Sequence, residues 1–176
     1  MKRFPLLGLL LLTSCATSYQ SQSFTGGYSE YLTAPDEAVI TFHGNGYTSA
    51  ERVGQMAALR AAEVTLQHGY RYFIATGIFD QSMNSSFTTP GYANTYGSAF
   101  GYGNYATANA TTVFTPPQTF NIPKPAITVS IKMSNDSQSL EPFGTFILGQ
   151  KARPKDAAFL SNSLRQFLGI KSASAS

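Results

Sequence analysis

Residues 48–79, TSAERVGQMAALRAAEVTLQHGYRYFIATGIF, carry the strongest structural pattern in the chain. Thr48 and Glu51 have the spacing of a capping box, in which two side chains satisfy backbone groups at the start of a helix. Residues 49–67 are mostly Ala, Leu, Met, Glu, Gln and Arg, which favour helix. Gly69 is expected to end the helix in a left-handed conformation. The stretch therefore begins with one long helix.

This helix has a narrow apolar stripe and leads directly into a strand. Its small and apolar side chains recur every three or four residues, at Val53, Ala57, Ala61 and Val64. Small side chains along one stripe predict that the helix lies close to a sheet. Residues 70–79 are rich in aromatic and β-branched side chains, which indicates a strand, and Gly77 within it is expected to mark a bulge.

Further strands lie on both sides of this unit. Residues 28–33 and 38–43 flank a Pro-Asp turn, which predicts a β-hairpin. Residues 126–133 alternate between apolar and polar side chains, as a half-buried strand does, and 143–148 form a shorter strand candidate. Pro154 is expected to open a last helix. The fold class is therefore α+β: a small, mostly antiparallel sheet with one long helix packed on a face and a C-terminal helix.

Residues 81–122 differ in composition from the rest of the expected single domain, 28–170. They are rich in Gly, Tyr, Asn, Ser and Thr, carry almost no charge and contain too few aliphatic side chains for a core of their own. A loop this long is either functional or disordered, and a hairpin extension of the sheet from Tyr102 to Phe114 is an alternative. Residues 171–176 are expected to be a disordered tail.

Tyrosines in this insertion are the candidate contacts with a partner, because Tyr offers a large contact area at low entropic cost. The alternative is a mobile loop with no role. The candidates are Tyr92, Tyr96, Tyr102 and Tyr105.

The N-terminal residues predict export. Lys2 and Arg3 precede a short apolar run that ends in Leu12-Thr13-Ser14-Cys15. The run is too short to cross a bilayer, which takes about 20 residues of helix. The pattern indicates a signal peptide over 1–14, cut between Ser14 and Cys15. An ordinary signal peptide with a cysteine beside the cut, or a buried apolar N-terminus, would be the alternatives.

The sequence around Cys15 resembles the lipobox of bacterial lipoproteins, in which a Leu stands three residues before the Cys. The resemblance implies that the Cys15 thiol receives a diacylglycerol and that the new amine is acylated. Ala16 stands where an Asp would resemble an inner-membrane retention signal, so we expect the outer membrane. Residues 15–27 are polar and small, and they predict a flexible lipidated tether.

Charge and chemistry exclude several classes of function. Loss of Lys2 and Arg3 with the signal peptide lowers the net charge from +3 to +1, which gives no argument for nucleic acid as a partner. Cys15 is the only cysteine, and His43 and His68 stand alone, so we expect no disulfide, metal site or cofactor.

No catalytic residues can be named from the sequence. Arg60 and Glu63 are spaced for an exposed or sheet-edge ion pair on the helix. An enzyme acting on an envelope substrate is the alternative function, and it would need a cleft near His43, Tyr47 or Arg60. A surface-displayed, adhesin-like module is a further alternative.

Four short motifs follow one another along the chain: GGYS at 26–29, GNGYT at 44–48, LRAAE at 59–63 and GYRYF at 69–73. Together with the lipobox they resemble a family of uncharacterised bacterial envelope lipoproteins. The resemblance covers about residues 26–80 and implies export and the fold, without a reaction. We therefore expect a non-enzymatic lipoprotein on the periplasmic face of the outer membrane that binds a protein or cell-wall partner.

Overall fold

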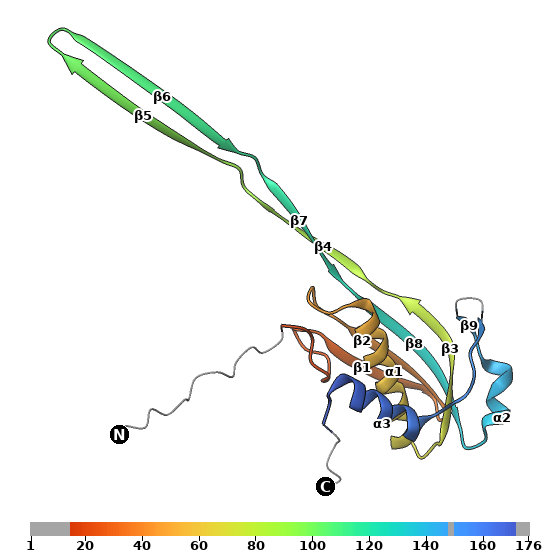
Figure 1. Cartoon of the computed structure of the whole chain (residues 1–176). Helices are drawn as coiled ribbons and strands as arrows, with labels where there is room; N and C mark the ends of the chain where they lie inside the picture. The colour runs from red at the N-terminus through yellow and green to blue at the C-terminus, as the bar shows by residue number, and fades with distance from the viewer. Residues whose placement is uncertain (1–14, 148–149, 172–176) are drawn as a thin grey trace, which may run out of the picture. The chain divides into compact units, whose positions relative to one another are not determined.

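The computed structural model describes residues 15–147 and 150–171 (Figure 1). The expected signal peptide 1–14, including Ser14, and the expected tail after Lys171 lie outside these residues. The chain divides into two compact units. One unit contains the chain up to Met83 and from Lys124 onward, and the other is Asn84–Pro123.

The first unit is built on a five-stranded sheet in the order β1-β2-β8-β3-β11. Every neighbouring pair in it is antiparallel. The strands are β1 (Gly27–Ala34), β2 (Glu37–His43), β8 (Ala126–Ser134), β3 (Tyr72–Asp80) and β11 (Lys155–Asp156). The predicted hairpin is the β1–β2 pair, and the predicted strand at 126–133 is β8 at the centre of the sheet.

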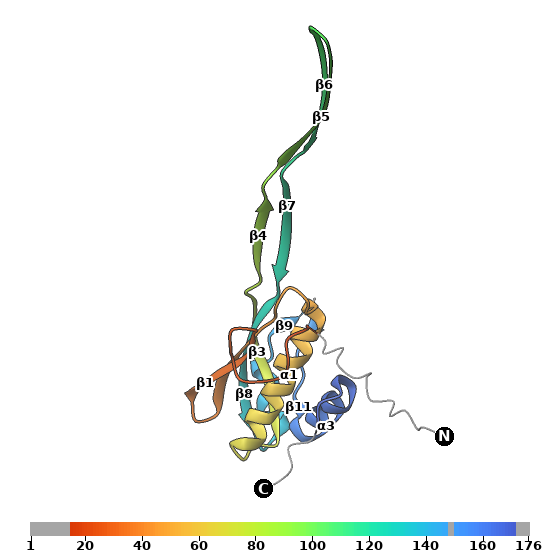
Figure 2. The same ribbon diagram turned by 90° about the vertical axis from the view of Figure 1, so that its left-hand side faces the viewer.

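Two helices cover one face of this sheet. The long helix α1 (Ala50–Gln67) packs against β2 and β8, and α3 (Ala157–Leu168) packs against α1, as Figure 1 and Figure 2 show. The antiparallel sheet, the long helix on its face and the C-terminal helix confirm the predicted α+β class. The core lies between sheet and helix, and its largest side chains are Phe42, Ile40, Met56, Leu59, Ile131 and Met133.

The alternation of side chains along the strands explains which face is covered. Ala38, Ile40 and Phe42 of β2 are buried against α1, and the residues between them are only half-buried. On the opposite face, the hydroxyl groups of Thr41 and Thr128 form a cross-strand hydrogen bond of 2.9 Å. The predicted bulge is also present, because the register of β3 shifts between Ala75 and Gly77.

Two local predictions are wrong. The N-cap of α1 is Ser49 rather than Thr48, and its hydroxyl accepts a hydrogen bond from the Arg52 amide. Helix α3 begins after Asp156 instead of at Pro154, because the Asp156 carboxylate caps the Phe159 amide.

The short strand expected at 143–148 is present over part of that range, as β9 (Phe146–Ile147), which pairs with β10 (Gln150–Lys151). It follows α2 (Ser137–Leu140) and a 3₁₀ turn (Glu141–Phe143).

The second unit consists of paired strands rather than a structureless loop. Its outer pair is β4 (Met83–Thr89) with β7 (Gln118–Lys124), and its inner pair is β5 (Tyr92–Tyr102) with β6 (Tyr105–Thr115). The two-residue loop between β5 and β6 starts at Gly103, whose φ of 60° favours glycine. We call β5 and β6 the ribbon, which Figure 1 shows as one continuous hairpin.

Candidate functional site

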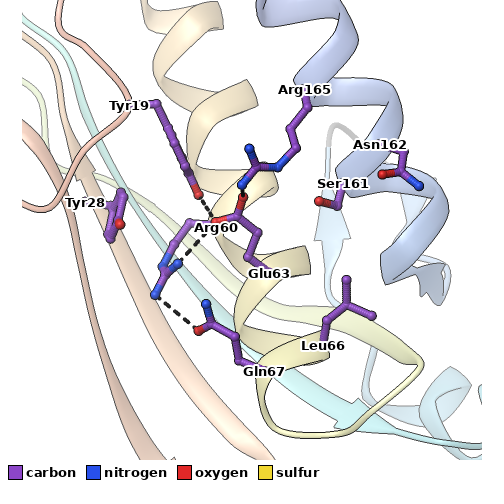
Figure 3. Close-up of a pocket in the computed structure, with 9 residues that line it drawn as sticks. All are labelled: Tyr19, Tyr28, Arg60, Glu63, Leu66, Gln67, Ser161, Asn162 and Arg165. Atoms are coloured by element: carbon purple, nitrogen blue, oxygen red, sulfur yellow. Dashed lines mark hydrogen bonds and ion pairs between the residues drawn. The ribbon is translucent and has the colours of Figure 1, made fainter. Parts of the chain in front are cut away.

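The best-defined polar site in the first unit centres on Arg60 of α1 (Figure 3). The Arg60 guanidinium donates two hydrogen bonds to the Glu30 carboxylate on β1, at 2.6 and 3.2 Å. It also donates to Glu63 at 3.1 Å and to the side-chain oxygen of Gln67 at 3.3 Å. The same guanidinium lies over the ring of Tyr28, 4.4 Å from its centroid, which adds a cation–π contact.

The Glu63 carboxylate is the acceptor that joins three parts of the chain. It accepts hydrogen bonds from the Tyr19 hydroxyl and from Arg60, and it forms an ion pair with Arg165 of α3. Arg60 and Glu63 are both buried. We call Tyr19, Glu30, Arg60, Glu63 and Arg165 the Arg60 cluster.

The Arg60 cluster changes the titration of two of its members. Burial and the hydrogen bond to Glu63 raise the pKa of the Tyr19 hydroxyl above its ordinary value, so this group stays protonated. Burial alone would lower the pKa of Arg60, but the hydrogen bonds and charge of Glu30 outweigh it and raise that pKa. The Arg60 cluster therefore holds two positive and two negative charges that neutralise one another.

A shallow cavity of about 460 Å³ adjoins the Arg60 cluster. Arg60 lines it, whereas His43 and Tyr47 do not, so the three residues considered for an enzyme do not meet there. The charged groups at its wall are committed to ion pairs with one another. The lining residues are Tyr19, Tyr28, Arg60, Glu63, Leu66, Gln67, Ser161, Asn162 and Arg165.

The ion pair predicted for Arg60 and Glu63 is present, at 3.1 Å, and Arg60 also bonds Glu30 on the edge strand β1, but the pair is buried and not exposed. Both side chains are buried, because Tyr19, Glu30 and Arg165 converge on them from three other segments. Sequence reasoning missed these partners, since nothing in the local sequence links them to α1. The usable signal was the position of Arg60 and Glu63 beside the apolar stripe, where charges need partners.

A second set of contacts holds the chain directly after Cys15. Thr17 is only 2% exposed. Its amide donates to the Thr48 hydroxyl at 2.8 Å, and its own hydroxyl donates to the Thr25 carbonyl at 3.0 Å. The backbone amide of Asn45 donates to the Thr17 hydroxyl at 2.9 Å, so this hydroxyl both donates and accepts a hydrogen bond. We call these contacts the Thr17 network.

Cys15 itself is bound at its carbonyl. The side-chain amide of Asn45 donates to this oxygen at 2.8 Å, while the oxygen of the same amide accepts from the backbone of Tyr47 at 3.0 Å. The Cys15 thiol is exposed. Residues 15–27 are thus held on the domain, and the flexible tether expected there is wrong from Thr17 onward, because buried polar groups fix the chain.

Glycines make this close approach feasible. Gly26 has a φ of 103°, and a Cβ there would lie 2.4 Å from the His43 carbonyl oxygen and 2.9 Å from the Thr17 methyl group. A side chain at Gly26 would therefore push the N-terminal segment off the domain. Residues from GGYS, GNGYT and LRAAE all contact residues 15–25, which gives these three motifs a common structural role.

The four tyrosines predicted as partner contacts lie on one face of the ribbon. The register pairs Tyr96 with Thr111 and Tyr102 with Tyr105, and alternate residues of each strand share a face. Tyr102 and Tyr105 are 93% and 85% exposed. Phe100 lies on this face too, whereas the opposite face carries mainly Ala, Gly and Thr.

Within 15–147 and 150–171, no group of three or more His, Cys, Asp or Glu side chains could hold a metal ion. In the same part of the chain, no helix has the length and apolar character needed to cross a bilayer.

No protein-family model, curated protein or solved structure matches this chain.

Proposed function

We propose that this protein is a lipid-anchored binding protein of a bacterial cell envelope, without enzymatic activity, that contacts another envelope protein or the cell wall through its ribbon. Its signal peptide, residues 1–14, is removed, and Cys15 carries the lipid. Ala16 favours the outer membrane, with the domain facing the periplasm. The lipobox-like sequence, Leu12-Thr13-Ser14-Cys15, supports the anchoring.

The observation that carries the binding proposal is the exposure of the ribbon. Residues 81–123 contain no Asp, Glu, Lys, Arg or His, and every described residue of β5 is exposed. A two-stranded hairpin in water gains little from burial on its own. An exposed, uncharged ribbon with aromatic side chains gathered on one face is typical of a surface that binds another molecule.

The non-enzymatic proposal draws support from the Arg60 cluster. A general acid or base must have a titrating group free to meet a substrate. Arg60, Glu63 and Tyr19 instead bond one another and residues of two further segments, which suits a structural clamp.

Anchoring is tested by a Cys15→Ser variant expressed in bacteria that are fed labelled palmitate. The proposal predicts labelled, processed wild-type protein and an unlabelled, unprocessed variant. The matched control is Thr17→Ser, which keeps a hydroxyl group two residues away and should be labelled as wild type. Normal processing of Cys15→Ser would refute the proposal.

Binding is tested by placing a photo-crosslinking amino acid at Tyr96, on the aromatic face. The matched control carries it at Ala99, on the opposite face of the same strand. We expect a crosslinked partner from position 96 in intact cells and a much weaker one from position 99. Equal or absent crosslinks at both positions would argue against the aromatic face as the contact surface.

A further inference from the structure

The start of the described chain is fixed to the domain within two residues of Cys15. The described chain begins close to the loop that leads into α1, which carries Asn45 and Thr48. The carbonyl of Cys15 is bound by Asn45, and Thr17 is buried in the Thr17 network. Two residues of chain span at most about 7 Å, so Cys15 is confined to this distance from Thr17.

A two-residue connection between the lipid and the domain restricts the domain's motion more than a flexible tether would. A flexible tether of about twelve residues would have a root-mean-square span of about 20 Å and would leave the domain free to tumble above a membrane. With Thr17 fixed, a lipid on Cys15 leaves the domain no such freedom. The end of the domain that carries Asn45 and Thr48 must then face the bilayer.

Two exposed aromatic side chains lie at this same end. Tyr47 is 77% exposed. Its backbone amide donates a hydrogen bond to the side-chain oxygen of Asn45, and the side-chain nitrogen of Asn45 donates to the Cys15 carbonyl. Phe24 is fully exposed, and the residue after it, Thr25, accepts a hydrogen bond from Thr17. Neither ring is used in the core. Tyrosine and other aromatic rings are favoured at the interface between lipid and water.

From these contacts we infer that the domain is seated directly on the membrane, with Tyr47 and Phe24 inserted into the lipid interface beside the acylated Cys15. The inference rests on the proposed lipidation of Cys15 and goes further, because it assigns a membrane-binding surface and an orientation. The opposite end of α1 points away from the bilayer. A helix of 18 residues is about 27 Å long, so the start of α3 near that end lies outside the interface.

The absence of tryptophan from the chain makes the inference directly measurable. Full-length protein carrying Tyr47→Trp or Phe24→Trp has one fluorescent reporter at the seat. The matched control is Phe159→Trp, an exposed aromatic in the first turn of α3. Each lipidated protein is purified from membranes and reconstituted in phosphatidylcholine vesicles with or without brominated acyl chains, which quench tryptophan on contact.

If the domain is seated on the membrane, brominated lipid should lower the tryptophan emission at positions 47 and 24 by about half and leave that at position 159 unchanged. The emission maximum at positions 47 and 24 should also lie at a shorter wavelength than that at position 159. A variant with about eight Gly/Ser residues inserted between Ala16 and Thr17 in the Tyr47→Trp protein should lose this quenching, because it restores a tether.

Palmitate labelling of the same samples separates the two proposals. Labelled protein whose position 47 is quenched no more than position 159 overturns the seating and leaves the lipid anchor standing. If position 47 is still quenched in the variant with the inserted linker, the claim that the Thr17 network holds the domain on the membrane is overturned. Unlabelled wild-type protein overturns the anchor, and the seating with it.

Discussion

The two units of this protein use the same cross-strand threonine pair in opposite surroundings. In the first unit, Thr41 and Thr128 bond at 2.9 Å in a sheet whose other face is covered by α1. In the ribbon, Thr95 and Thr112 bond at the same 2.9 Å, with both strands exposed. This cross-strand contact is therefore the same in the two units, and the difference lies in what covers the strands.

Because of this difference, the first unit supplies the stability of the fold, and the ribbon supplies exposed side chains. The first unit buries apolar side chains and encloses charges that neutralise one another in the Arg60 cluster. The ribbon relies on its backbone ladder and pairwise side-chain contacts, which contribute a fraction of a kcal/mol each. Its side chains remain available for binding because no core requires them.

Removing the central carboxylate of the Arg60 cluster should have the largest effect. Glu63→Ala leaves Arg60 and Arg165 without their shared acceptor, so we expect the free energy of unfolding of the first unit to fall by about 3–5 kcal/mol. Urea denaturation followed by circular dichroism measures the change. Glu51→Ala is the matched control, since Glu51 is exposed on the same helix and should change stability by less than about 0.5 kcal/mol. Equal effects of the two substitutions would contradict a buried structural clamp.

Removing one hydroxyl from the Arg60 cluster should have a smaller, pH-dependent effect. Tyr19→Phe loses a hydrogen bond to a carboxylate, which corresponds to about 1.5–3 kcal/mol at neutral pH. Because the pKa of Tyr19 is raised in the folded state, its contribution is present below the ordinary value of 10.0 and is lost as the pH rises above it.

Urea denaturation of wild type and Tyr19→Phe from neutral pH to about pH 11 measures this dependence. The difference in stability between the two proteins should narrow as the pH rises above 10.0. Tyr31→Phe serves as the control, because Tyr31 is an exposed tyrosine of β1 outside the Arg60 cluster. A constant difference between wild type and Tyr19→Phe across this range would contradict the assigned hydrogen bond.

The two threonine pairs allow the same Thr→Val substitution to be compared in the two units. Thr41→Val should lower the free energy of unfolding of the first unit by less than about 1 kcal/mol. Thr95→Val should leave that free energy unchanged and should alter only the hydrogen exchange of ribbon amides. A loss of global stability from Thr95→Val would show that the two units unfold together.

Removal of the ribbon should have the smallest effect on the first unit. Replacing residues 91–116 by Asn-Gly shortens a connection without touching the core, so we expect a change in its free energy of unfolding below about 1 kcal/mol. Circular dichroism and urea denaturation measure the outcome. Loss of folding in this variant would mean that the ribbon supports the first unit.

Much of the first unit could be predicted from local patterns. The stripe of Val53, Ala57, Ala61 and Val64 placed α1 against a sheet, and the alternation of residues 126–133 placed β8 half-buried. These predictions succeed because period and composition are properties of neighbouring residues. The role of Thr48 was missed, because its hydroxyl serves Thr17, a residue 31 positions earlier.

The candidate sites divide in the same way. The tyrosines at 92, 96, 102 and 105 were identified from composition, but their common face follows only from the β5–β6 register. Tyr19 and Arg165 carried no signal that could link them to Glu63, since 44 and 102 positions separate them from it. Contacts over such distances depend on how the sheet and helices are assembled.

The amino-acid sequence by itself determined the helix, the main strands, the uncharged character of the ribbon and the lipobox-like pattern at Cys15. Each of these features depends only on residues that are close together in the chain. Only the tertiary structure decided that the segment after Cys15 is part of the domain. Gly26 makes room for Thr17, Asn45 holds the Cys15 carbonyl and Glu63 holds Tyr19. Polar residues 15–27 look like a tether in isolation, and they become fixed because their hydrogen-bonding groups find buried partners that are distant in the chain.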